Sequence, residues 1–199
     1  MNQESTSSLL EQQNSKSSDF LDLVATRRTI HLYEATEVAE EYVDAAVQAA
    51  HFAPNHKLTW PWRFTKIGQE TKAKINELAL KMKATNGPLD DTQLELFNKK
   101  RVNPQLLVVS QVKSSDPAQS KEDYAAVSCA IQNLCLAFAS FGVGTKWSTG
   151  SMTRHPIAYE LAQIDHDFEE IVGFIWYGYA ARTPRPRRPS LDTVYRAVP

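Results

Sequence analysis

Residues 121–150 read KEDYAAVSCAIQNLCLAFASFGVGTKWSTG, and they contain the longest periodic segment of the chain. Apolar side chains recur at helical spacing along one face of it: Tyr124, Val127, Ile131, Leu134 and Phe138. This spacing predicts a helix over about 121–141, which Gly142 is expected to end. A short strand is expected at 145–149, inside a small polar turn that contains one aromatic residue, Trp147.

Shorter periodic segments lie on both sides of this helix. Further helices are expected at 19–27, from Glu37 to the stop at Pro54, and at 69–84, 91–100 and 155–163. Further strands are expected at 62–67, 105–112 and 171–179, and the last has so little polarity that it should be central. Ser18 and Thr36 are expected to cap the first two helices. Helices outnumber strands without a regular βαβ alternation, so the class is predicted to be α+β.

The composition suggests three regions along the chain. Residues 1–18 are rich in Ser, Gln, Asn and Glu, which predicts a mobile tail. Residues 19–182 hold the periodic segments and form the expected folded domain. Residues 183–199 are rich in proline, so they are expected to be irregular and to lie over another surface.

The overall composition excludes several classes of protein. A net charge of −1 over 199 residues gives no electrostatic case for binding nucleic acid or an anionic membrane. No apolar run approaches the roughly 20 residues of a membrane helix, and the first residues lack the features of a secretory signal. The two cysteines, Cys129 and Cys135, are too few for a disulfide framework and are expected to be buried. We therefore expect a cytoplasmic protein.

Common catalytic and metal motifs are missing. The run Gly142-Val143-Gly144-Thr145-Lys146 lacks the third glycine of a Rossmann loop and the Gly-Lys-Ser/Thr end of a P-loop. The five histidines show no ligand spacing, so no metal site is predicted, and no G-x-S-x-G sequence marks a nucleophile.

Three other segments combine residues suited to binding. Arg27-Arg28-Thr29 places two guanidinium groups and a hydroxyl at a helix-to-loop junction, which suits a phosphate, although a solvated basic helix end is also possible. Residues 53–64 read APNHKLTWPWRF, in which two prolines fix a loop with polar side chains. That loop could also be a rigid connector with its tryptophans in the core. Residues 144–150, GTKWSTG, form the third segment.

In this order and spacing, the segments resemble the nitroreductase family of FMN-dependent oxidoreductases. The family pattern has an R-R-S/T opening, an A-P…P-W-x-F loop, a glycine-rich W-S-G type turn and a G-F-I-x-x-G strand before an Arg/Pro tail. The chain carries these as 27–29, 53–64, 142–150, 173–178 and 184–189, with the loop most similar to the compact branch that has P-D-H-K there. The resemblance runs from about residue 20 to residue 195.

The resemblance implies a mixed sheet flanked by helices, and a homodimer with FMN at the interface. The residues it assigns to the cofactor are Arg27, Arg28 and Thr29 at the phosphate, with Arg187 from the partner's tail and Arg185 as a weaker candidate; Phe52, His56 and Lys57 from the loop; and Trp147, Ser148 and Thr149 along the ring. No catalytic side chain is expected, because FMN carries the chemistry. NADH or NADPH would supply hydride, and a small-molecule acceptor such as a nitroaromatic or a quinone would then take two electrons.

The chain departs from the family pattern at three positions. His31, Leu58 and Trp60 stand where the pattern has a second arginine, an asparagine and a glutamine. These departures leave a non-enzymatic flavin-binding protein as one alternative. A reductive dehalogenase or flavin-modifying relative is another, for which residues 84–104 are the only candidate lid.

Overall fold

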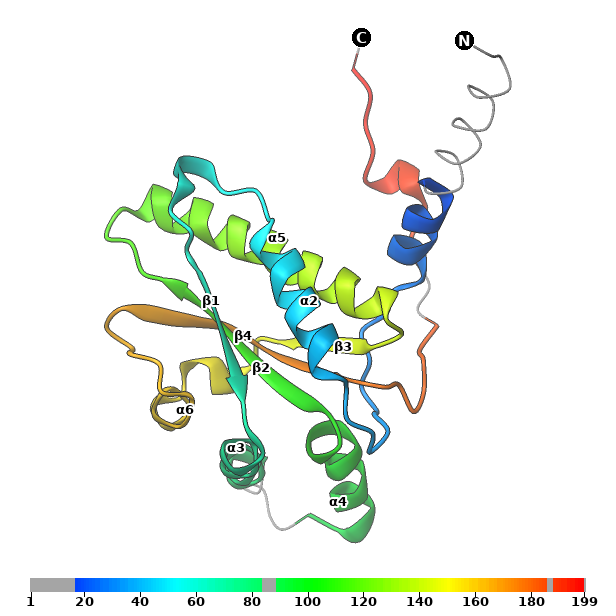
Figure 1. Cartoon of the computed structure of the whole chain (residues 1–199), viewed down its shortest axis with the longest axis vertical. Helices are drawn as coiled ribbons and strands as arrows, with labels where there is room; N and C mark the ends of the chain where they lie inside the picture. Colours follow the sequence, from blue (N-terminus) through cyan, green and yellow to red (C-terminus); the bar gives the residue numbers. More distant parts are fainter. Residues whose placement is uncertain (1–16, 84–88, 186–187, 199) are drawn as a thin grey trace.

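The computed structural model describes residues 17–83, 89–185 and 188–198. Its centre is a four-stranded sheet with the order β1-β2-β4-β3, and each neighbouring pair is antiparallel (Figure 1). The strands are β1 (Trp62–Ile67), β2 (Gln105–Val112), β3 (Gly144–Ser148) and β4 (Glu169–Gly178). The α+β class is confirmed. A mixed sheet was expected, and within the described residues the parallel pairing is limited to a bridge between Thr29 and Thr145.

Helices cover both faces of this sheet (Figure 1). The labelled helices are α2 (Glu40–His51), α3 (Gln69–Lys83), α4 (Asp91–Phe97), α5 (Pro117–Ser140) and α6 (Pro156–Ala162), with short turns η1 (His56–Leu58), η3 (Asn98–Val102), η4 (Ser151–Arg154) and η5 (Leu191–Thr193). A further helix covers residues 17–26. Helices α2 and α5 pack on one face, whereas α3 and α6 pack on the other.

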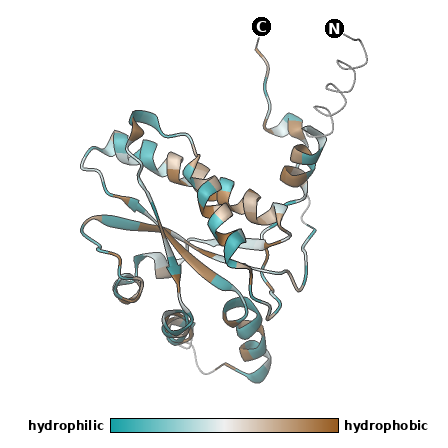
Figure 2. Cartoon of the chain, in the orientation of Figure 1, coloured by the Kyte–Doolittle hydropathy of each residue, from teal (hydrophilic) through white to brown (hydrophobic). Residues whose placement is uncertain are grey.

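The alternation of side chains in the two central strands divides the core between these faces. In β2, Leu107 and Val109 point to the α2/α5 side, and Leu106 and Val108 point to the α3/α6 side. All four are fully or almost fully buried, and β4 is buried from Ile171 to Gly178; these two strands are the most hydrophobic in Figure 2. Strands buried on both faces lose the polar alternation of a surface strand. The prediction that 171–179 is a central strand is therefore confirmed.

The start of α2 differs from the prediction. The helix begins at Glu40 rather than near Glu37, and its N-cap is Ala39, whose side chain forms no capping hydrogen bond. Val38 is buried, and its backbone N–H donates to Gln105 Oε1 at 2.7 Å. Because this contact ties the preceding segment to β2, helical geometry starts only after it. Thr36 is thus not a cap.

The apolar face of α5 also needs correction. Val127, Ile131, Leu134 and Phe138 are buried as predicted, but Tyr124 is 49% exposed. The adjacent Asp123 is buried instead, because polar partners hold its carboxylate. The helix is also longer than expected and starts at Pro117, after an Asp116 cap. Of the two cysteines that were expected to be buried, Cys135 is buried and Cys129 is exposed.

The ends of the described chain depart from the expected tails in two details. Residues 17 and 18 are helical, so Ser18 lies inside the first helix rather than at its cap. In the C-terminal segment, η5 forms one short turn where only irregular structure was expected. The predicted helix stop at Asn86-Gly87 lies outside the described residues.

Candidate functional site

The two arginines of the opening motif lie beside the start of β3. The helix ends at residue 26, as the helix-to-loop junction required, and the Ile30 N–H then donates to the Thr145 carbonyl at 2.9 Å. Thr29 itself is exposed next to this bridge. A cavity of about 220 Å³, here called the arginine pocket, has Arg27, Arg28 and residues 142–145 in its lining.

The two guanidinium groups are not equivalent. Arg28 Nη1 donates to the carbonyl oxygens of Ala25 at 2.5 Å and Arg27 at 2.8 Å, so this side chain covers the end of the helix. Arg27 makes no side-chain hydrogen bond or ion pair with any residue in the described part of the chain. Its donors are therefore available to an anion, whereas those of Arg28 are partly used.

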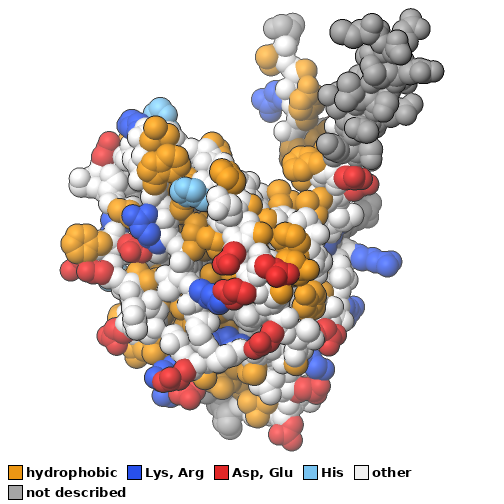
Figure 3. Space-filling model, in the orientation of Figure 1, with side chains coloured by type: hydrophobic (Ala, Val, Ile, Leu, Met, Phe, Trp, Pro, Cys, Tyr) orange, Lys and Arg blue, Asp and Glu red, His pale blue; other side chains and the backbone are white. Residues whose placement is uncertain are grey.

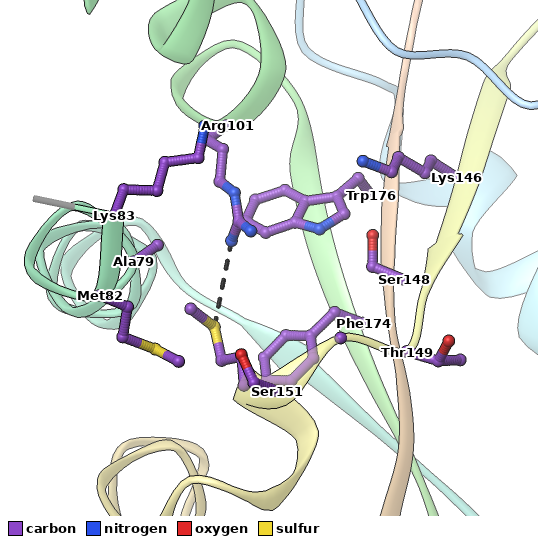
Figure 4. A pocket seen from close by; sticks show the side chains of 12 residues that line it. Ala79, Met82, Lys83, Arg101, Lys146, Ser148, Thr149, Ser151, Phe174 and Trp176 are labelled. Atoms are coloured by element: carbon purple, nitrogen blue, oxygen red, sulfur yellow. Dashed lines mark hydrogen bonds between the residues drawn. The ribbon is translucent and has the colours of Figure 1, made fainter. Parts of the chain in front are cut away.

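A second cavity opens at the other end of β3. It has a volume of about 470 Å³ and is here called the cationic pocket (Figure 4). Its lining comes from α3, the turn before β2, β3, η4 and β4: Ala79, Met82, Lys83, Arg101, Lys146, Ser148, Thr149, Gly150, Ser151, Met152, Phe174 and Trp176. Two predicted site residues, Ser148 and Thr149, are thus brought together with three cationic side chains.

Burial and neighbouring positive charge make the charged forms of the basic side chains around this pocket less favourable. The Arg101 guanidinium lies over the Trp176 ring, 4.9 Å from its centroid, and burial lowers its pKa. Burial also lowers the pKa of Lys146, and the positive charges of Arg101 and Lys100 act in the same direction. His31 has a lowered pKa through burial and through Lys146. No acidic residue of the described chain lines the pocket, so the site favours an anion or an electron-rich ring.

The two pockets share β3. Along β3, the arginine pocket ends at Thr145, and the cationic pocket begins at the adjacent Lys146 and reaches Thr149, four residues beyond Thr145. Four residues of extended chain span roughly 13 Å. An elongated ligand with a phosphate at one end and a flat ring at the other could therefore lie along this edge of the sheet.

Trp147 points away from the cationic pocket. Its indole packs over Gly173 on the α5 side of the sheet, and its Nε1 donates to the Val172 carbonyl at 3.3 Å. Side chains alternate along a strand, which puts Trp147 opposite Lys146 and Ser148. The predicted role of Trp147 along the ring remains a prediction.

This close packing makes Gly173 intolerant of a side chain. A Cβ at this position would lie 2.1 Å from Trp147 Nε1 and 2.4 Å from Cδ1. We expect Gly173→Ala to lower the free energy of unfolding by about 1–3 kcal/mol, and to shift the tryptophan emission. Gly68→Ala is the matched control, since nothing lies within 4 Å of its Cβ position. Equal stability of the two variants in urea titrations would contradict the packing argument.

The loop after α2 has an unusual backbone. Lys57, Leu58 and Trp60 have φ angles of 59°, 53° and 49°, a left-handed conformation that non-glycine residues rarely adopt. Asn55 stabilises it, because its Oδ1 accepts from the Trp60 N–H at 2.6 Å and its Nδ2 donates to Thr59 Oγ1 at 3.1 Å. The bonds explain how a glycine-free loop holds this shape.

A buried carboxylate anchors the same loop to α5. The Thr59 hydroxyl donates to Asp123 Oδ1 at 2.5 Å, and Gln119 Nε2 donates to the same oxygen at 2.9 Å. We expect Asp123→Ala to lower the free energy of unfolding by about 1–3 kcal/mol, and to speed proteolysis within 55–60. Asp123→Asn keeps an acceptor oxygen and should have the smaller effect. Unchanged loop cleavage in Asp123→Ala would show that the anchor is dispensable.

Two of the loop residues assigned to the cofactor, His56 and Lys57, lie far from the arginine pocket. His56 Nε2 and Lys57 Nζ are each 3.9 Å from Glu122 Oε2, near the start of α5. The arginine pocket includes Ala139, near the end of that helix. At 1.5 Å per residue, the two groups are separated by about 26 Å along α5, which exceeds the length of a flavin mononucleotide.

Large apolar side chains are exposed around this loop (Figure 3). Phe52 is 73% exposed, Leu58 66% and Trp60 45%. Within one chain, therefore, the structure brings Arg27, Arg28, Ser148 and Thr149 to the two pockets along β3, and leaves Phe52, His56 and Lys57 outside them. Arg187 lies outside the described residues, so its predicted role is open.

Sequence reasoning missed the three cations of the second pocket. Lys83, Arg101 and Lys146 come from segments 18 and 45 residues apart, and no local spacing links them. A sequence signal for Lys146 did exist, because this residue lies within the 144–150 turn of the family pattern. The signal for the buried Asp123 was its position, since it is an acidic residue next to the apolar face of a helix.

The described residues contain neither a metal-binding cluster nor a membrane-spanning helix. No group of three or more His, Cys, Asp or Glu side chains in these residues could hold a metal ion. None of the described helices is long and apolar enough to cross a membrane.

Comparison with known proteins places the chain in a family. The sequence profile described as "Nitroreductase family" matches residues 24–179. YfhC from Bacillus subtilis strain 168, provisionally named an NAD(P)H nitroreductase, is 30% identical over 171 residues, covering 84% of this chain and 87% of YfhC.

Solved structures show the same fold. A nitroreductase-like family protein from Bacillus cereus superposes with a TM-score of 0.76 at 22% identity, covering 90% of this chain and 95% of that protein. Oxidized iodotyrosine deiodinase bound to FMN and 3-iodo-L-tyrosine superposes with a TM-score of 0.69 at 21% identity, covering 90% and 99%. The sequence match over most of its length shows that the chain belongs to the nitroreductase family.

Proposed function

We propose that this protein is an FMN-dependent oxidoreductase that uses NADH or NADPH to reduce small acceptors such as nitroaromatics and quinones. The observation that carries the proposal is the pair of pockets along β3, one with a free arginine and one with three cations. Family membership and the FMN in a solved relative support it. A cytoplasmic location, where nicotinamide donors are present, is part of the proposal.

The residues present fit the cofactor. Arg27 offers an unused guanidinium for the phosphate, and Thr29, two residues further along the chain, is exposed although it does not line the pocket. Guanidinium groups bind phosphate through paired, charge-assisted hydrogen bonds, which explains arginine rather than lysine here. Ser148 and Thr149 would lie along the ring at the other end of β3. The span of roughly 13 Å from Thr145 to Thr149 suits an elongated cofactor.

When bound, FMN would accept hydride from NAD(P)H and pass two electrons to an acceptor that enters after the nicotinamide has left. The chain's own contribution is binding and electrostatics. Arg101 would place positive charge beside the ring, where negative charge develops during reduction, and a preorganised cation lowers the barrier to such a step. The apolar surface of Phe174 and Trp176 excludes water from one side of the pocket.

A second copy of the chain would complete the site. His56 and Lys57 are about 26 Å from the arginine pocket along α5, so they cannot touch the same cofactor within one chain, and Phe52 lines neither pocket along β3. Their exposure on the surface fits contact with the cofactor of a partner in a homodimer. The tail at 183–199, including Arg187, is proposed to cross to that partner.

An absorbance spectrum tests the proposal most directly. The purified protein should show flavin bands, which should bleach when NADPH or NADH is added without oxygen and return when a quinone is added. A colourless protein that does not take up FMN would refute the cofactor. A yellow protein that neither donor bleaches would favour the non-enzymatic flavin-binding alternative.

The dehalogenase alternative receives no specific support. In the candidate lid, Phe97 is 4% exposed, and Lys72 Nζ donates to the Val102 and Pro104 carbonyls at 2.9 and 2.8 Å. Residues 91–104 are thus packed against α3 and the sheet, and Arg101 within them forms part of the fixed wall of the cationic pocket.

A further inference from the structure

The cationic pocket carries more positive charge than the proposed cofactor explains. Lys83 comes from the end of α3, Arg101 from η3 and Lys146 from β3, and Figure 4 shows them on different walls of one cavity. None of the three forms an ion pair with another residue in the described ranges. By contrast, Lys74 and Lys99 on the same side of the protein pair with glutamates one helical turn away.

Holding these cations together without a counter-charge is unfavourable. Lys146 is half-buried, and its pKa is lowered by burial and by the charges of Arg101, Lys100 and Lys83. Arg101 is also fixed, because its guanidinium lies 4.9 Å from the centroid of the Trp176 ring and its Nη1 contacts Met152 Sδ at 4.0 Å. An anion that enters the pocket would relieve the repulsion, since desolvated charges interact more strongly than solvated ones.

The phosphate of the cofactor is not that anion. Its proposed place is the arginine pocket, which Thr145 lines, whereas the adjacent Lys146 lines the cationic pocket, and side chains of adjacent residues in a strand point to opposite faces of the sheet. The rest of the cationic pocket is apolar and aromatic, with Phe174 and Trp176 on β4 and two methionines, Met82 and Met152. Flat apolar walls beside a cluster of cations suit an aromatic ring that carries an oxyanion.

We propose that the cationic pocket selects aromatic electron acceptors that carry a carboxylate or a similar oxyanion, with Lys83 and Lys146 as the selecting residues. The inference rests on the proposed function and names the acceptor class for that site. For a nitroaromatic acid, the balanced reaction is Ar–NO₂ + NAD(P)H + H⁺ → Ar–NO + NAD(P)⁺ + H₂O. The nitro group takes up two electrons and two protons and loses water, while the nicotinamide is oxidised by two electrons.

A pair of matched acceptors tests the selection. The purified flavin-loaded protein is assayed with 4-nitrobenzoate and 4-nitrobenzamide, which differ in charge but little in size. We expect kcat/KM to be roughly ten- to a hundredfold higher for the acid, as for a charge-assisted hydrogen bond, and the ratio to fall as salt is added. Equal values for the two acceptors, with good turnover of both, would overturn the proposal and leave the proposed function intact.

Variants assign the selection to its residues. Lys83→Met and Lys146→Met should each lower the acid-to-amide ratio about tenfold, with bound flavin measured in every preparation. Lys81→Met is the control, because Lys81 and Lys83 are both exposed on α3 and only Lys83 lines the pocket. A ratio that stays at its wild-type value in both pocket variants would overturn the assignment.

Two further arms separate this proposal from its alternatives. The first compares the rate of flavin bleaching by NADPH with the rate by NADH. A strong preference for NADPH that is lost in both pocket variants would assign the cations to the 2′-phosphate of NADPH, and would overturn the acceptor proposal. Calorimetric titration with 4-toluate and 4-toluamide gives a readout without turnover. Tighter binding of the acid, lost in Lys83→Met and Lys146→Met, supports the proposal even if the proposed reductase activity fails.

Discussion

Replacing Arg27 with alanine is expected to weaken FMN binding by roughly ten- to a hundredfold. A hydrogen bond to a charged group contributes about 1.5–3 kcal/mol, and Arg27 is the guanidinium in the arginine pocket whose donors are unused by the described chain. No single substitution within 142–150 should cost as much. The measurement is flavin retention after dialysis, followed by titration of the apoprotein with FMN.

Arg28→Ala is the matched control for this prediction. It removes the same charge from the adjacent position, but the Arg28 guanidinium already donates to the carbonyls of Ala25 and Arg27. Its loss should therefore reduce the stability of the helix end and affect flavin binding less. Full flavin retention in Arg27→Ala would remove this residue from the proposed phosphate site, and a larger loss in Arg28→Ala would exchange the two roles.

Elements defined by local pattern were predictable from the sequence. The strands β1 and β2 have the predicted bounds, 62–67 and 105–112, because turn residues or polar residues flank each short apolar or alternating run. The helix-to-loop junction at Arg27 and the interior position of β4 were predicted equally well. In these cases the information lies within a few residues of the element it describes.

Elements that depend on distant partners were not predictable. Helix α2 starts three residues late because Val38 is tied to Gln105, 67 positions away. Tyr124 is exposed because Asp123 is held inward by Thr59, which lies 64 positions away. Helical periodicity cannot distinguish two adjacent positions when a hydrogen bond across the fold decides which of them is buried.

The residues of the candidate site also differ in whether local sequence pattern or distant contacts bring them together. The arginine motif and the turn after α5 are each a short continuous stretch of sequence. Arg27, Arg28, Ser148 and Thr149 could therefore be predicted from local pattern. The three cations of the cationic pocket come from three separate segments, and each of its lysines resembles a solvated surface residue when it is viewed alone. Only the fold shows that they share a cavity without an acidic partner from the described chain.

Removing the C-terminal tail after Thr183 is expected to weaken both dimerisation and FMN binding. The described part of this tail extends away from the sheet (Figure 1) and carries four apolar side chains that are 69–81% exposed: Leu191, Val194, Tyr195 and Val198. Burying each of these on a partner would contribute on the order of 1.5–3 kcal/mol. A proline-rich chain extends at about 3.1 Å per residue, which gives the tail ample reach across a dimer face.

A full-length variant separates the apolar contacts from the length of the tail. Leu191→Ser combined with Tyr195→Ser keeps Arg185, Arg187 and Arg188, and removes two of the exposed apolar side chains. If the tail binds a second subunit, sedimentation should show the truncated protein shifted toward monomer and the double variant shifted less. The FMN titration should weaken most in the truncation, because that variant alone loses Arg187. An intact dimer with an unshifted titration in the truncated protein would mean that the tail is solvated, and that Arg187 has no part in the phosphate site.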